Sequence, residues 1–499
     1  MILKSKEIEI RNGKIVDVRP AVKGIKIISE AGEWYFERGY ATAGFCDSHF
    51  HLPWLGDKLT GLDLSKAGGF GDLLSKALAH KSDAEWLVGR GWIEESWSAE
   101  DMPSLNQLDA AFPARPVLFI RKDEHSALIN SAGMERCGIS IASDFAEVFL
   151  PRLTTGAPAG IVCDDALSYV YSKLPPESET EFHNKIKAAE REIVKYGITE
   201  IHEMKLEIPQ IPMYMNSAEY GSLSGLKVTA YLVATAEEIR SRRIVPFTDG
   251  NFSLRGIKFF LDGSFGSASA AMKNPFESGQ NGLLTWESRE KFKELIVESV
   301  SRALQPAVHA IGDNAVKELL EVYREVYDEI PKLPALPFRI EHAQSTDAAD
   351  LGLFMGFPLV ASLQPIHAIS DEAMCRRLLG AERLGEAYRM RSIAERVQKI
   401  IGGSDAPIES HSPFDGIAAF VRRDWNTDEL IDRKTAIEAF TANPRIASGT
   451  DKLRGRIKIG AEADIAIIDN NILNCPPVEI QNTSVLATFT NGKAVYLAD

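Results

Sequence analysis

The amino-acid sequence predicts an α/β protein: a (β/α)8 barrel, or TIM barrel, with a long insertion after strand 1, plus a small β-sandwich-like domain built from both chain termini. Three observations lead to this prediction. Hairpin patterns occur near both ends, eight strand-sized apolar runs lie between them, and helix-like stretches separate the later runs. At 499 residues the chain exceeds the length at which a single core stops growing, so more than one folding unit is expected.

The first predicted element is a β-hairpin over residues 8–18. Apolar residues alternate with polar ones on both sides of an Asn-Gly pair, which is the strongest short-range hairpin signal. Residues 485–497 repeat this pattern after a strand-like run at 463–468. Because a lone hairpin is only marginally stable in water, we expect the two termini to share one small β domain. Two separate edge hairpins are the alternative interpretation.

Eight apolar runs of strand length predict the barrel. They are residues 43–50, 198–204, 227–233, 256–261, 306–311, 338–343, 358–363 and 399–403. Stretches with helical spacing of apolar residues, such as 287–303 and 315–323, alternate with the later runs, as is typical of parallel βαβ units. Runs two to eight follow one another at the spacing of single crossovers, whereas the gap after run one is far longer. We therefore expect an insertion at about residues 55–185.

The predicted organisation has three segments. Residues 1–43 and 448–499 form the small β domain, and residues 44–447 form the barrel with its insertion. Active sites of such barrels lie at the carboxyl ends of the strands. The insertion would rise from this rim, where long loops serve as lids and set specificity.

Composition and charge exclude several classes of function. Apolar residues make up 45% and charged residues 25% of the chain, as in ordinary globular proteins. A net charge of −14 repels phosphate backbones and anionic membranes, so we expect a small-molecule substrate, no nucleic acid and no membrane partner. Whether the chain forms a homo-oligomer is left open. Five scattered cysteines, and the lack of an apolar run of signal-peptide or membrane-span length, favour a cytoplasmic location.

Residue types that bind metals stand at the ends of the predicted strands. His49 and His51 close run one, and residues two apart on a strand project to the same side, so both imidazoles can reach one cation. The further candidates follow on later runs: Lys258, His309, His342 and Asp405. Taken singly, each histidine is more often a satisfied core residue than a ligand. Independent strand assignments nevertheless place the whole set at one rim, which predicts a metal centre. Lys258 could ligate only if it were deprotonated or carboxylated.

Six ordered motifs resemble the amidohydrolase superfamily, specifically its family 3 branch, which holds N-substituted formamide deformylase-like and exoenzyme-regulatory-protein-like members. The motifs span nearly the whole chain and are residues 44–51, 258–267, 309–313, 339–344, 364–367 and 403–407. The resemblance implies two divalent metal ions, with Zn²⁺ expected: one held by His49, His51 and Asp405, the other by His309 and His342, with a carboxylated Lys258 between them. Without carboxylation a single metal is implied. Ala268 departs from the family, since many relatives carry Arg there, and this change bears on substrate recognition.

Such a centre supports hydrolysis. Bound Zn²⁺ lowers the pKa of its water to about 7 and polarises a carbonyl group. We therefore expect a metal-bound hydroxide to attack a carbon–nitrogen bond of the non-peptide amide type, with Asp405 as the catalytic general base that passes a proton to the leaving amine. Two alternatives remain: a catalytically inactive small-molecule-binding or regulatory barrel protein, and a metal-free enzyme that uses Lys258 as a Schiff base. The sequence does not identify the substrate, because function depends on the site rather than on the fold.

Other residues are candidates for roles around the metals. Each ligating imidazole needs an acceptor for its second N–H group, and Asp47, Asp313 and Glu341 lie near the histidines in sequence. The candidates for contact with the substrate are His367 at the end of run seven, Asp262 after run four, and His125 and Trp92 in the insertion. Capping, salt bridging, a turn or core packing is the structural alternative for each of them.

Overall fold

The chain divides into two compact units. The structure is a computed structural model that describes residues 2–82, 84–94, 97–122, 124, 126–330 and 336–498. One unit comprises Met1–Leu52 and Glu190–Asp499, and the other comprises Pro53–Ala189. Helices α1 (Leu52–Thr60) and α6 (Glu179–Ile193) cross the two boundaries. Within the described part of the chain, every helix is too short or too polar to span a membrane.

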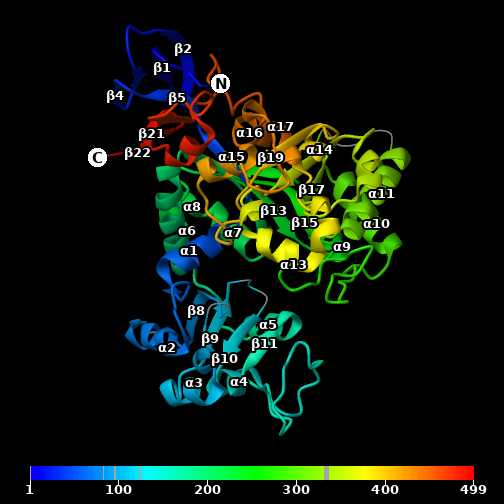
Figure 1. The fold of residues 1–499 in the computed structure, drawn as a ribbon. Helices are drawn as coiled ribbons and strands as arrows, with labels where there is room; N and C mark the ends of the chain where they lie inside the picture. Colours follow the sequence, from blue (N-terminus) through cyan, green and yellow to red (C-terminus); the bar gives the residue numbers. More distant parts are fainter. Residues whose placement is uncertain are drawn as a thin grey trace. The chain divides into compact units, whose positions relative to one another are not determined.

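A barrel of parallel strands forms the centre of the first unit (Figure 1). Among the described residues its strands are, in order around the barrel, β6 (Phe45–Phe50), β12 (Ile198–Leu206), β13 (Lys227–Val233), β15 (Phe252–Phe260), β16 (Gln305–Ala310), β17 (Phe338–His342), β18 (Leu359–Leu363) and β19 (Lys399–Gly402). The short strand β14 (Phe247–Asp249) pairs antiparallel with β15. Phe50 bridges Ala406, and the His51 N–H group donates to the Ala406 carbonyl at 3.0 Å. These contacts join the end of the first strand to the loop directly after the last strand, and the predicted barrel is confirmed.

Helices cover the barrel strands. They are α7 (Gln210–Met215), α8 (Ser217–Tyr220), α9 (Ala236–Ser241), α10 (Arg289–Ser301), α11 (Asp313–Glu329), α12 (His367–Ser370), α13 (Glu372–Arg383), α14 (Met390–Ala394), α15 (Pro413–Val421), α16 (Arg433–Ala439) and α17 (Ala442–Ala447). Helix α11 shows why the pattern predicts them, since it buries Val316, Leu319 and Tyr323 on one face. Every residue of β6, β17 and β18 is buried, because barrel strands face the packed interior on one side and helices on the other. Polar residues within these strands therefore need partners inside the protein.

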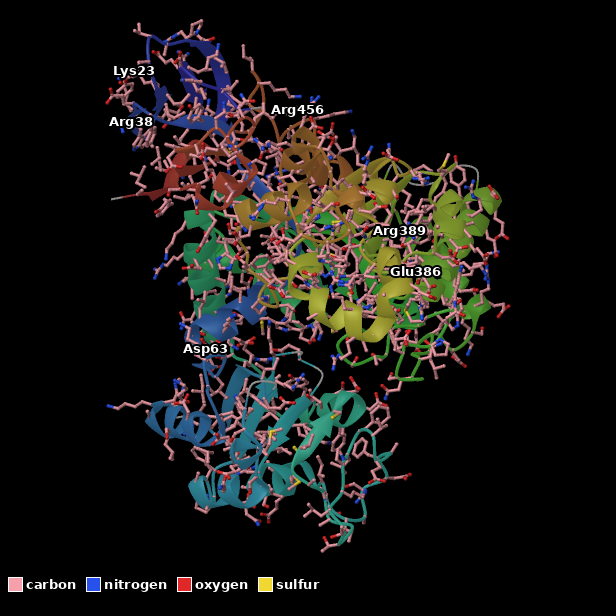
Figure 2. All side chains as sticks on the ribbon, viewed as in Figure 1. Lys23, Arg38, Asp63, Glu386, Arg389 and Arg456 are labelled. Carbon is pink, nitrogen blue, oxygen red and sulfur yellow. The ribbon has the colours of Figure 1, made fainter. Side chains whose placement is uncertain are left out.

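The small β domain consists of two sheets. The first has the order β2 (Lys14–Pro20), β1 (Lys6–Arg11), β3 (Ile25–Ser29), β4 (Gly32–Phe36), and the second has the order β22 (Lys493–Leu497), β21 (Val485–Thr490), β20 (Ile465–Ile468), β5 (Tyr40–Ala43). Apolar side chains of both sheets, including Ile8, Ile465 and Phe489, share one core. The domain is thus built from both termini, as predicted. Exposed charged residues such as Lys23, labelled in Figure 2, lie on its surface.

The second unit has a sheet and a core of its own. Its strands, in sheet order, are β11 (Ile161–Cys163), β10 (Ser126–Ile129), β9 (Val117–Arg121), β8 (Leu87–Trp92) and β7 (Leu62–Asp63), and its helices are α2 (Phe70–Ala79), α3 (Leu105–Ala111), α4 (Ser131–Cys137) and α5 (Asp164–Tyr171). Alternate residues of β9 enter two different apolar clusters, with Phe119 in one and Leu118 in the other. Because side chains alternate along a strand, both faces of this sheet are covered. The sequence places the insertion at about 55–185, and this unit spans residues 53–189.

Candidate metal centre

Four imidazoles form a row at the carboxyl ends of β6, β16 and β17. The ring centroids of His51 and His49 are 5.5 Å apart, those of His49 and His342 are 4.7 Å apart, and those of His342 and His309 are 4.5 Å apart. The strand geometry explains this row: His49 and His51 are two residues apart and project to one side of β6. Parallel pairing then sets Ala310, next to His309, beside His342. Side chains from three strands thus meet at one rim.

Asp405 joins this row from the loop after β19. Its Oδ1 lies 3.0 Å from His51 Nε2 and 3.5 Å from His49 Nε2. One ligand atom from each of these three residues lies within 4.8 Å of the others, as a shared metal ion requires. Burial alone would raise the pKa of the Asp405 carboxyl, but the neighbouring imidazoles of His49 and His51 hold it well below its usual range. Asp405 is therefore an ionised carboxylate.

Hydrogen bonds determine which nitrogen of two imidazoles is free to bind a cation. His49 Nδ1 lies 2.7 Å from Glu341 Oε2, and His309 Nε2 lies 3.0 Å from the Gly263 carbonyl oxygen. Both partners can only accept here, so these two nitrogens carry the protons. The lone pairs consequently reside on Nε2 of His49 and on Nδ1 of His309.

Burial keeps most of these imidazoles neutral. It lowers the pKa of His49 to about 4 and that of His309 to about 3, with the Lys258 ammonium adding to the effect, and it lowers the pKa of His342 well below its usual value. A neutral imidazole is the form that ligates a metal. His51 differs, because Asp405 and Glu203 outweigh its burial and raise its pKa.

Lys258 lies buried beside the imidazoles. Its side chain is 1% exposed, and its Nζ, 5.0 Å from the Phe260 ring centroid, has no hydrogen-bond partner among the described residues. Burial lowers the pKa of the amine to about 8. Nδ1 of His342 likewise has no partner in the described part of the chain. Buried polar atoms are rarely left unsatisfied, so these orphaned nitrogens next to an ionised Asp405 fit a site built for a divalent cation.

Glu341 is, among the described residues, the one of the three predicted acceptors that contacts an imidazole. Asp47 instead accepts from the backbone N–H groups of His49 at 3.1 Å and Ser404 at 3.0 Å. Asp313 accepts from the backbone N–H of Lys273 at 2.9 Å. These contacts correct the prediction for Asp47 and Asp313, because strand ends and turns expose backbone donors that compete for a nearby carboxylate.

Asp262 is likewise occupied by backbone donors. Its carboxylate accepts from the N–H groups of Ala271 and Ile311, each at 3.0 Å, and of Gly312 at 2.8 Å. It therefore holds the loops after β15 and β16 together, while its Oδ1 also lies 3.6 Å from His309 Nε2. Contact of Asp262 with the substrate stays a prediction. Trp92 is buried in the core of the second unit, where its indole N–H donates to the Phe119 carbonyl at 2.8 Å. This contact agrees with core packing. His125 lies outside the described residues.

His367 lies beside the centre, as the first residue of α12. Gln344 Nε2 donates to His367 Nδ1 at 3.2 Å, so the proton of a neutral His367 is on Nε2. This nitrogen is 3.9 Å from Asp405 Oδ2. His367 can therefore offer an N–H group next to the carboxylate.

Two residues of the site, Glu203 and Arg339, are absent from the sequence prediction. Glu203 Oε1 is 3.7 Å from His51 Nδ1, and its carboxylate also accepts from the backbone N–H groups of Leu52 and Lys205. Arg339 donates to both oxygens of Glu341. The signal was available in the sequence, since both residues are charged and lie within predicted barrel strands, where buried charges occur only when paired.

A second group of three residues of metal-binding types is instead part of a network of ion pairs and hydrogen bonds. Atoms of Cys46, Glu200 and His202 lie within 4.8 Å of one another, and all three residues are buried. Glu200 pairs with Arg445 at 3.1 Å, and His202 Nδ1 accepts from Arg339 at 2.8 Å. The charges of these two arginines oppose the binding of a cation there.

Comparison with known proteins gives consistent matches along nearly the whole chain. The pattern of the Amidohydrolase family matches residues 38–496. The chain is 27% identical over 471 residues to the putative amidohydrolase YtcJ of Bacillus subtilis (strain 168), covering 91% of this chain and 88% of that protein. It is 21% identical over 484 residues to the N-substituted formamide deformylase of Arthrobacter pascens, with the same coverage of 91% and 88%. The solved structure of an uncharacterized metal-dependent hydrolase from Pyrococcus horikoshii OT3 has the same fold, with a TM-score of 0.77 at 23% identity, covering 95% of this chain and 99% of that one.

Proposed function

The chain belongs to the amidohydrolase family, and from this we propose that it is a metal-dependent hydrolase that cleaves a carbon–nitrogen bond in a small, non-peptide, amide-like substrate. The observation that carries the proposal is the convergence of His49, His51 and Asp405 within ligand distance of one another, with the imidazoles of His342 and His309 next to them. The names of the amidohydrolase and deformylase relatives support the choice of bond.

The donor set suits two divalent cations, for which we propose Zn²⁺. His49, His51 and Asp405 would hold one, His309 and His342 the other, and Lys258, once carboxylated, would supply the anionic group between them. Nitrogen and oxygen donors of this kind are those that zinc takes in proteins. When bound, a divalent cation supplies Lewis acidity, which lowers the pKa of a water molecule to about 7 and polarises a carbonyl oxygen. An unmodified Lys258 would leave a site for one cation.

Asp405 would act as the general base. It would take a proton from the attacking water while the water oxygen bonds to the acyl carbon, and would pass the proton to the nitrogen as the carbon–nitrogen bond breaks. Two contacts fit this role: Oδ1 lies against His51, and the Asp405 backbone N–H donates to the His49 carbonyl at 2.8 Å. The carboxylate is thus ionised and its main chain is tied to β6.

His367 and Phe260 would contact the substrate. The Nε2–H of His367 lies next to Asp405 and would donate to the substrate carbonyl or to the leaving group. Phe260 is 44% exposed although it ends a barrel strand, and its ring centroid lies 5.6 Å from that of His309. It would provide an apolar wall beside the reacting bond.

The test is a hydrolysis screen on zinc-loaded protein with simple amides, N-formyl amines, ureas and lactones, following amine release. We expect Asp405→Asn to retain part of the zinc and to lose turnover by about 10²- to 10⁴-fold, the usual contribution of a general base. Asp249→Asn, the same change on an exposed residue of β14, is the matched control and should retain activity. Equal rates in zinc-loaded and chelator-treated protein would contradict the proposal, and wild-type rates in Asp405→Asn would remove the role of Asp405.

Lys258 gives a second candidate, a metal-free enzyme that forms a Schiff base. The observation in its favour is the buried amine with a pKa lowered to about 8, which is the activated state that imine formation needs. Borohydride reduction in the presence of a carbonyl substrate would trap Lys258 covalently in that case. Stoichiometric zinc, together with no trapped adduct by mass spectrometry, would exclude it.

A further inference from the structure

We propose that Arg339 is a positioning residue of the metal centre, which acts by holding Glu341 so that this carboxylate orients His49. The inference rests on the proposed function, because it assigns His49 as a ligand. Arg339 lies on β17, two residues before Glu341, and its side chain is completely buried. A buried guanidinium must satisfy its donors inside the protein, and the partners that Arg339 uses are the evidence for its role.

The guanidinium of Arg339 connects four barrel strands beneath the histidines. Nε and Nη2 donate to the two oxygens of Glu341, and Nη1 donates to His202 Nδ1 at 2.8 Å. Nη2 also donates to the backbone carbonyl of Ser48 and to Ser362 Oγ at 3.3 Å. Ser48 directly precedes His49 on β6. Arg339 therefore fixes the main chain next to the ligand as well as the carboxylate behind it.

The two-oxygen contact explains why arginine is suited to this position. A guanidinium fork that meets both oxygens of a carboxylate prevents the carboxylate from rotating. Oε2 of Glu341 is thereby directed at His49 Nδ1, 2.7 Å away. With its proton held on Nδ1, His49 presents the lone pair of Nε2 on the side where Asp405 Oδ1 lies, 3.5 Å away.

Two neighbouring side chains restrict the orientation of the Arg339 guanidinium. Because arginine can only donate, His202 must accept through Nδ1, so it is a neutral imidazole with its proton on Nε2. On another side, Cζ of Arg339 lies 4.7 Å from the Tyr231 ring centroid. These two neighbours confine the guanidinium to the orientation that meets Glu341.

His51 provides an internal contrast. Its neighbouring carboxylate, Glu203, is held by the backbone N–H groups of Leu52 at 2.7 Å and Lys205 at 2.9 Å. The carboxylates beside the two histidines are thus held by different means: Glu341 by the side chain of Arg339, and Glu203 by the main chain. Loss of Arg339 should therefore affect the support of His49 and leave that of His51 intact.

The test compares two buried arginines by the affinity of the full-length protein for Zn²⁺, measured in zinc-buffered chelator solutions on the folded fraction. Arg339→Met should weaken zinc binding about 10- to 100-fold, the usual effect of losing an outer partner of a ligand. Arg445→Met is the matched control, because Arg445 is also fully buried and pairs with a carboxylate, Glu200, at 3.1 Å. Both variants should unfold at lower temperature, but Arg445→Met should bind zinc as the wild type does. Equal zinc affinity in Arg339→Met and the wild type, or equal losses in the two variants, would overturn the proposal.

A double-mutant cycle tests the route through Glu341. If Arg339 acts by holding this carboxylate, Arg339→Met should cause little further loss of zinc affinity in a Glu341→Gln background, and fully additive losses would overturn the proposal. If Arg339→Met fails to fold, Arg339→Lys is the variant to measure, since lysine keeps the positive charge but cannot contact both oxygens of Glu341. Weakened zinc binding in Arg339→Lys would support the positioning role, and wild-type zinc binding would overturn it. Failure of the wild type to bind zinc at all would instead overturn the proposed function.

Discussion

Glu200 shows how a charge is accommodated at the other end of the barrel strands from the metal centre. It is fully buried near the start of β12, where Arg445 approaches at 3.1 Å and Arg454 at 3.8 Å. Burial raises its pKa, but the two arginines outweigh burial and lower the pKa to about 2. Glu200 therefore stays ionised because two arginines are its partners.

Replacing Glu200 should remove a pH-dependent part of the stability. A carboxyl whose pKa falls on folding stabilises the protein above its ordinary value of 4.5, and this contribution is lost as the pH falls toward its folded value of about 2. Glu200→Gln leaves Arg445 unpaired, so we expect a loss of about 3–5 kcal/mol in the free energy of unfolding at pH 7. The difference between the two proteins should narrow below pH 4.5. Urea unfolding at a series of pH values measures this difference in the free energy of unfolding. A difference that stays constant down to pH 3 would contradict the lowered pKa of Glu200.

At the scale of elements, the loops after the strands set the geometry of the centre. Asp262 ties the loop after β15 to the loop after β16 through three backbone N–H groups, and the carbonyl of the next residue, Gly263, accepts from His309. The position of a ligand on one strand thus depends on a turn that follows its neighbour.

Asp262→Asn should loosen this connection. An amide has one oxygen where the carboxylate has two, so at least one buried N–H group would lose its acceptor at a cost of about 1–3 kcal/mol. We expect that loss of stability in urea unfolding, together with a lower zinc content per protein molecule, measured by mass spectrometry after dialysis. Asp249→Asn, on the exposed β14, is the control and should change neither quantity. Wild-type stability in Asp262→Asn would show that the tie between the loops is unimportant.

The same loops explain which parts of the site could be predicted from the sequence. His49, His51, His309 and His342 could be found because a residue at the end of an apolar run has one possible position in a barrel, at its rim. The partners of Asp47, Asp262 and Asp313 could not be found, because a carboxylate near several exposed backbone donors chooses among them by loop geometry. Glu203 and Arg339 could be recognised as charged residues within predicted barrel strands. Their contacts with His51, His202 and Ser48 could not be predicted, because these join different strands and depend on the barrel register.

At the scale of the whole molecule, every proposed ligand of the metals belongs to the unit that contains the barrel. Metal binding and folding of this unit are therefore linked, since any ligand that binds the native state alone stabilises it. Removal of zinc by a chelator should lower the unfolding temperature of the wild type, with a stabilisation of about 4 kcal/mol expected when free zinc is 1,000 times its dissociation constant. Differential scanning calorimetry with and without zinc measures this shift. Absence of the shift in protein that contains zinc would mean that the metal lies at an unstructured or external site.

Lys227 links the barrel to the small β domain. It lies on β13 with a side chain that is 2% exposed, and its Nζ contacts Glu462 at 2.7 Å, Asn491 at 2.9 Å and the carboxylate of Asp464. These three partners come from the carboxyl-terminal part of the chain. The terminal domain, which has an apolar core of its own, is thus attached to the barrel by a buried ion pair.

Lys227→Met should therefore destabilise the whole unit. It leaves buried Asp464 without its cation, and breaking a buried pair from one side costs about 3–5 kcal/mol. Lys227→Met combined with Asp464→Asn removes both charges and should recover much of that loss, because a neutral pair carries no uncompensated charge. Urea unfolding of the two single variants and the double variant measures the coupling. Zinc affinity of the folded fraction should stay at the wild-type value in all three variants, since neither Lys227 nor Asp464 forms a hydrogen bond or ion pair with a proposed metal ligand among the described residues. Independent unfolding of the β domain at a lower urea concentration than the barrel would contradict the linkage, because the buried ion pair requires the two to unfold together.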